Sequence, residues 1–93
     1  EMAILKIYET ERAKYAAAGH PLYEETKNND MRNVGTYCTA DEREMFAECY
    51  ALLTSGHCGS YSVIMEHFPE TFKAIKGLLK QIRNADDSSR SSA

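Results

Sequence analysis

The residues of this chain whose types and spacing could carry chemistry lie between Thr36 and Tyr50. Within this stretch, Glu44 and Glu48 are four residues apart, a spacing that places both carboxylates on one face of a helix. Two like charges one turn apart cost about 0.2–0.5 kcal/mol in an isolated helix. Either both carboxylates lie in water and this small cost is accepted, or one of them binds a cation.

The helix that would carry these glutamates has clear start and stop signals. Thr39 and Glu42 have the spacing of a capping box, and Gly56 is suited to a helix end. The sequence therefore predicts a helix over residues 40–55. Beside the glutamates we expect an apolar stripe formed by Phe46, Cys49, Tyr50 and Leu53.

Three further helices are predicted around this one. They span residues 2–18, 60–67 and 69–84, with Gly19 after the first and Pro69 in the opening turn of the last. Residues 20–35 are polar and predict a loop with one short helical turn. The fold class is therefore all-α, a small helical subdomain of about four helices over residues 1–84. Residues 85–93 are predicted to be an exposed, polar and disordered tail.

Helical periodicity also predicts which side chains are buried. The last helix has an apolar stripe of Phe72, Ile75, Leu79 and Ile82. Its basic residues, Lys73, Lys76, Lys80 and Arg83, are interpreted as a solvated face. Tyr8, Tyr15 and Tyr23 are interpreted as packing or interface aromatics. We expect one shared core of Phe46, Leu53, Ile64, Phe72, Ile75 and Leu79.

Composition limits the classes of function. The 93 residues have a formal net charge of −3, so no basic excess points to nucleic acid or to an anionic membrane. No apolar run approaches the roughly 20 residues of a membrane span, and the N-terminus does not resemble a signal peptide. Because the chain begins with Glu1 and not with Met, we expect a fragment or a processed product.

The three cysteines, Cys38, Cys49 and Cys58, match no zinc-ribbon or zinc-finger spacing. We interpret them as reduced and mostly buried, which is compatible with a cytoplasmic protein. A zinc cluster of His57 with these cysteines is disfavoured because the spacings are irregular.

Three segments together resemble the C-terminal end of the anthrax lethal factor family. They are Thr36-Tyr37, the run Glu-Arg-Glu-Met-Phe-Ala-Glu-Cys-Tyr from Glu42 to Tyr50, and Phe68-Pro-Glu-Thr-Phe72 before a closing amphipathic helix. Their order and spacing are similar to those of the family, and the resemblance covers residues 34–82. Members of this family are zinc-dependent endopeptidases of the gluzincin type, so the resemblance implies a secreted effector or toxin.

The resemblance also implies a role for each matching residue. Glu44 matches the acidic residue that completes the zinc coordination, and Tyr37 matches the tyrosine whose hydroxyl points at the scissile carbonyl. Glu48 matches an acidic residue that we expect to hold a ligand histidine through its second ring nitrogen. A catalytic zinc takes three protein ligands, which in this family are two histidines and one glutamate.

The chain departs from the family in one large respect. A gluzincin needs a His-Glu-x-x-His helix, and none of the three histidines here lies in such a motif. We therefore expect the C-terminal half of a zinc endopeptidase domain that acts on proteins or peptides. It would be active only with the upstream part of the same chain or with a protein partner, and the 93 residues alone should bind zinc weakly or not at all. The alternative is a non-catalytic helical module for protein binding or for a larger assembly such as a virion or toxin.

Overall fold

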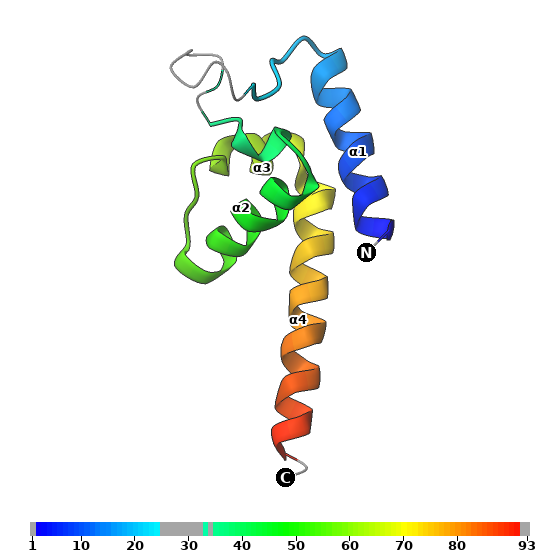
Figure 1. The fold of residues 1–93 in the computed structure, drawn as a ribbon, viewed down its shortest axis with the longest axis vertical. Helices are drawn as coiled ribbons and strands as arrows, with labels where there is room; N and C mark the ends of the chain where they lie inside the picture. Colours follow the sequence, from blue (N-terminus) through cyan, green and yellow to red (C-terminus); the bar gives the residue numbers. More distant parts are fainter. Residues whose placement is uncertain (1, 25–32, 34, 92–93) are drawn as a thin grey trace.

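The computed structural model describes residues 2–24, 33 and 35–91. Within these residues it contains four α-helices, one short 3-10 helix and no strand, which confirms the predicted all-α fold (Figure 1). The elements are α1 (Met2–Ala17), η3 (Tyr37–Thr39), α2 (Glu42–Ser55), α3 (Tyr61–His67) and α4 (Pro69–Ser91).

The longest helix, α4, is the axis around which the other elements gather (Figure 1). Its first half contacts α1, α2 and α3, and η3 packs on α2. Its second half projects beyond this body and carries the C-terminus away from it (Figure 1). The candidate residues on η3 and α2 therefore lie in the body and not on the projecting helix.

The core is built from aromatic, aliphatic and sulfur-containing side chains that every helix of the body contributes. At its centre the ring of Phe68 is completely buried and contacts Tyr8 and Tyr15, with ring centroids 5.8 and 5.7 Å apart. Both tyrosines are packing residues, as predicted. The core residues are Tyr8, Tyr15, Cys38, Met45, Cys49, Ile64, Phe68 and Ile75.

The predicted core is only partly correct. Ile64 and Ile75 are confirmed, and Phe72 and Leu79 pack half-buried at its edge. Phe46 and Leu53 were wrongly placed, because Phe46 is 36% exposed and Leu53 lies outside the core cluster.

The error on α2 is a rotation of the helix by one residue. The buried stripe is Met45, Cys49 and Leu52, whereas the predicted stripe was Phe46, Cys49, Tyr50 and Leu53. Both sets have helical spacing, so periodicity alone does not choose between them. The tertiary contacts place Met45 inward, where its Sδ lies 3.7 Å from the Sγ of Cys49. Tyr50 is left 51% exposed on the outer face.

The start of α2 also differs from the prediction. Asp41, and not Thr39, is the N-cap, and its Oδ1 accepts a hydrogen bond of 2.9 Å from the Glu44 amide. Thr39 is fully buried, where its hydroxyl donates to the Thr36 carbonyl and accepts from the Tyr23 amide. Since that hydroxyl is already engaged, it does not cap α2. The helix ends as predicted at Gly56, which has a φ of 88°.

A side chain from α1 caps the start of α4. The carboxylate of Glu11 accepts hydrogen bonds from the Glu70 amide, the Thr71 amide and the Thr71 hydroxyl, at 3.1, 2.8 and 2.6 Å. Pro69, the first residue of the helix as predicted, has no amide to satisfy. This contact fixes α1 against α4 at the point where the latter enters the core.

Two segments were predicted to lie outside the helices, residues 20–35 and residues 85–93. Most of the predicted loop at 20–35, including residues 25–32 and 34, lies outside the described residues. The expectation of a disordered tail after residue 84 differs from the structure, in which α4 continues to Ser91. No Gly or Pro stands between Leu78 and Ser91, so nothing in the sequence breaks the helix at the predicted end. Ile82, predicted to be buried, is 56% exposed because α4 has left the body at this point (Figure 1).

Candidate functional site

The first candidate residue, Glu44, lies in the first turn of α2 and is half-buried. Its backbone amide donates to Asp41, which lowers the pKa of the Asp41 carboxyl below its usual value. Among the described residues, no hydrogen bond or ion pair of the Glu44 carboxylate itself is found. This side chain is therefore placed at the edge of the body with its oxygens available to a ligand.

The second candidate, Glu48, has a structural role that the sequence did not reveal. Its Oε1 accepts a hydrogen bond of 3.0 Å from the Ser60 amide, just before α3 begins. The Ser60 hydroxyl in turn accepts from the Cys38 amide at 3.1 Å. Glu48 and Ser60 therefore join α2, the start of α3 and η3. The expected contact of Glu48 with a ligand histidine stays a prediction.

The third candidate, Tyr37, is the first residue of η3 and is 42% exposed. Its ring meets that of Tyr23 edge to face, with centroids 5.0 Å apart and planes at 82°. Because η3 packs on α2, the structure places Tyr37 and Glu44 on two elements that contact one another.

The position of η3 is fixed from α1 by two hydrogen bonds that the sequence did not reveal. The Tyr8 hydroxyl donates to the Cys38 carbonyl at 2.8 Å, and the Arg12 Nε donates to the Thr39 carbonyl at 2.7 Å. Both contacts join residues far apart in the chain, so no local sequence pattern predicts them. Together with Ser60 they hold the backbone of η3 on two sides and fix the direction from which Tyr37 projects.

A metal site needs more ligands than this region supplies. Among the described residues, no group of three His, Cys, Asp or Glu side chains is placed to hold a metal ion. The rings of His20, His67 and Tyr15 contact one another, with centroids between 4.6 and 4.9 Å apart, and His57 is exposed beyond the end of α2. Glu44 thus suits the role of one zinc ligand, but a catalytic zinc would need two more from outside this set.

The three thiols lie close to the candidate residues but are unreactive at neutral pH. Cys38 and Cys49 are completely buried, and this burial raises the pKa of each thiol to about 12. Cys58 is half-buried, and burial raises its pKa as well. Since the thiolate is the nucleophile and the metal ligand, these cysteines are packing residues at neutral pH.

The raised thiol pKa values predict a loss of stability at alkaline pH. Unfolding lowers each pKa to its ordinary value near 8.5, so above about pH 9 the unfolded chain releases protons that the folded chain keeps. The folded state is then destabilised by about 1.4 kcal/mol per pH unit for each buried thiol. In urea unfolding with a reductant present, Cys49→Ala should be less stable than the unaltered chain at pH 7, and this difference should narrow by about that amount from pH 9 to pH 10.

The matched control for this prediction is Cys58→Ala, because Cys58 is half-buried and not fully buried. Its stability difference from the unaltered chain should change less over the same pH interval. Parallel pH curves for the unaltered chain and Cys49→Ala would contradict the assignment of a buried, protonated thiol.

Two further findings concern membrane spans and similarity to known proteins. No helix in the described part of the chain has the length and apolar character needed to cross a membrane. No family model matches the chain, and no curated protein or solved structure matches it.

Proposed function

We propose that these residues are the C-terminal part of a lethal-factor-like zinc endopeptidase domain, with Glu44 as the third zinc ligand and Tyr37 beside the scissile carbonyl. The observation that carries the proposal is the placement of Glu44. It is a half-buried carboxylate without a side-chain partner among the described residues, on the helix against which the 3-10 helix of Tyr37 packs. The resemblance of residues 36–50 and 68–72 to the family supports the same assignment.

The chemistry of such a site divides between the metal and this chain. Zinc, when bound, acts as a Lewis acid that polarises the substrate carbonyl and activates water for attack. The Glu44 carboxylate would hold the metal, and the Tyr37 phenol would donate a hydrogen bond to the carbonyl oxygen as it gains negative charge. Glu48 has one oxygen on the Ser60 amide, so its second oxygen is the one that could orient a ligand histidine.

The test uses the longer polypeptide, or the complex, that carries a His-Glu-x-x-His helix together with these residues. Glu44→Ala should lower zinc affinity, measured by calorimetric titration, and peptidase activity with it, because one of three ligands is lost. The fall in zinc affinity should exceed that of Glu48→Gln, which is expected to be about 10- to 100-fold, as for other residues that orient a ligand.

The matched control is Glu42→Ala, since Glu42 shares the first turn of α2 with Glu44 and is exposed. It should leave both zinc affinity and activity unchanged. Full zinc affinity and full activity in Glu44→Ala would end the assignment of this helix to a peptidase site, and the chain would then be a non-catalytic helical module.

A further inference from the structure

The apolar stripe of α4 continues beyond the core to which it contributes. Ile75 is buried, Leu78 and Leu79 are half-buried, and Ile82 one turn further is 56% exposed. This change follows the course of the helix, whose first half contacts α1, α2 and α3 and whose second half projects beyond the body (Figure 1). An amphipathic helix keeps such a stripe where another surface covers it.

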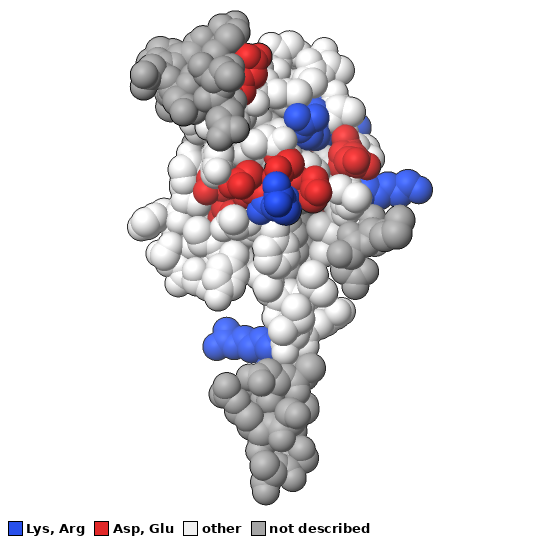
Figure 2. Space-filling model, in the orientation of Figure 1, with Lys and Arg blue, Asp and Glu red and all other residues white. Residues whose placement is uncertain are grey.

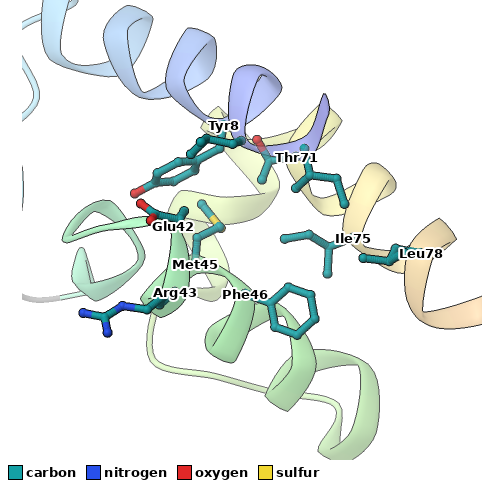
Figure 3. Close-up of a pocket in the computed structure, with 10 residues that line it drawn as sticks. Tyr8, Glu42, Arg43, Met45, Phe46, Thr71, Ile75 and Leu78 are labelled. Atoms are coloured by element: carbon teal, nitrogen blue, oxygen red, sulfur yellow. The ribbon is translucent and has the colours of Figure 1, made fainter. Parts of the chain in front are cut away.

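At its upper end, this stripe opens into an apolar groove between α1, α2 and α4. The groove has a volume of about 180 Å³, and its walls include Leu5 and Tyr8 from α1 and Ile75 and Leu78 from α4. Figure 3 shows the ring of Phe46 on α2 directed toward the Ile75 and Leu78 side chains across this groove. Phe46 is 36% exposed, so an aromatic ring forms part of the accessible wall.

Among the described side chains of α4, the basic residues beside the stripe lie along one edge. Lys76, Lys80 and Arg83 are spaced i, i+4 and i+7, which puts them in a row along one side of the apolar residues. All three are exposed, and none forms an ion pair with another described residue. The opposite edge carries the uncharged Ala74, Gly77 and Gln81. Figure 2 shows a basic side chain standing out from the projecting part of the helix.

This one-sided charge argues against an antiparallel pairing of α4 with a second copy of the chain. Two antiparallel α4 helices related by a two-fold axis place the same edge of each helix side by side. The row of Lys76, Lys80 and Arg83 would then face its own copy, and like charges in such a pairing are destabilising. A partner helix with acidic residues on the matching edge would instead be attracted to this basic row.

We propose that the groove and the projecting stripe of α4 bind an amphipathic helix of another protein that carries acidic residues along one edge. The apolar side of this helix would lie over Phe46, Leu78 and Ile82, as in the helix-in-groove mode of recognition. Its acidic edge would pair with the basic row of α4, which sets the direction of the bound helix. This surface does not include Glu44 or Tyr37, so it is independent of the proposed peptidase site.

The test uses two synthetic peptides of about three heptads with leucines along one face, labelled with fluorescein. One peptide has glutamates along one edge of the leucine face, and the other has lysines at the same positions. Fluorescence anisotropy should show saturable binding of the glutamate peptide and at least about tenfold weaker binding of the lysine peptide. The double variant Lys80→Glu/Arg83→Glu should reverse this preference.

Ile82→Ser tests the apolar part of the surface without disturbing the core, because Ile82 is exposed. It should weaken binding of the glutamate peptide about tenfold. Tyr61→Ser is the matched control, since Tyr61 is 50% exposed on α3 and does not line the groove. Equal affinity for the two peptides, or no binding of either, would overturn the proposal. So would a dimer in light scattering that Ile82→Ser converts to a monomer, since the cover would then be a second copy.

Discussion

On the proposed peptidase assignment, replacing Tyr37 with phenylalanine in the polypeptide or complex that also carries a His-Glu-x-x-His helix is expected to slow peptide-bond hydrolysis about 100- to 1,000-fold, while zinc affinity stays unchanged. The change removes one hydroxyl, the group proposed to donate to the carbonyl oxygen in the transition state. Loss of one such donor costs about 3–4 kcal/mol of transition-state stabilisation. Steady-state kinetics should therefore show the effect in kcat, and calorimetric titration should show no change in zinc binding.

This substitution keeps the known contacts that position η3. A phenylalanine ring can keep the edge-to-face contact with Tyr23, and the backbone of η3 is held by contacts from Ser60 and Tyr8 that do not use the Tyr37 side chain. Tyr50→Phe is the matched control, because it removes a hydroxyl from a 51% exposed tyrosine on α2. Equal activity of the two variants, or a loss of zinc in Tyr37→Phe, would contradict the proposed role.

The ends of α1 and α2 and the start of α4 could be predicted because their signals are local. Gly19 and Gly56 adopt positive φ at the two predicted helix ends, and Pro69 opens α4. These residues act through their own backbone geometry, which does not depend on the rest of the fold. The long connection between α1 and η3 contains no comparable signal, and most of it lies outside the described residues.

The start of α2 shows where local signals are insufficient. Thr39 with Glu42 and Asp41 with Glu44 are overlapping pairs, in each of which the acidic residue is three positions after the cap residue. The choice between them is made by tertiary contacts, because the buried Thr39 hydroxyl is engaged by Thr36 and Tyr23. The same holds for Glu48, whose partner Ser60 is twelve residues away and belongs to another element. Glu44 and Glu48 could be assigned to one face of α2 from the sequence, but the partners of these side chains could not be predicted.

The orientation of α2 has a consequence for the candidate site. With Met45, Cys49 and Leu52 turned inward, Glu44 and Glu48 lie on one flank of the buried stripe, and Phe46 and Tyr50 lie on the other. The carboxylates and the aromatic wall of the groove are therefore separated by the helix itself. This separation is the reason that zinc binding and helix binding can be tested with different variants.

The three phenylalanines of the chain allow the largest effect on stability to be predicted with internal controls. Phe68 is completely buried between Tyr8 and Tyr15, Phe72 is half-buried at the edge of the core, and Phe46 is 36% exposed. Phe68→Ala should cost about 3–5 kcal/mol, because it removes the whole ring and leaves a cavity that the surrounding helices fill only in part. That is a large share of the roughly 5–15 kcal/mol by which a typical domain is stable.

The same truncation at the other two positions should cost progressively less. Phe72→Ala is expected to cost about 1–3 kcal/mol, and Phe46→Ala about 0.5 kcal/mol. Urea unfolding followed by circular dichroism measures all three on one scale. The helical periodicity of the sequence placed Phe46 and Phe72 in the core and did not include Phe68, so it predicts a different order. A Phe46→Ala variant as unstable as Phe68→Ala would mean that α2 packs with its other face inward. The placement of Glu44 beside η3 would then also be wrong.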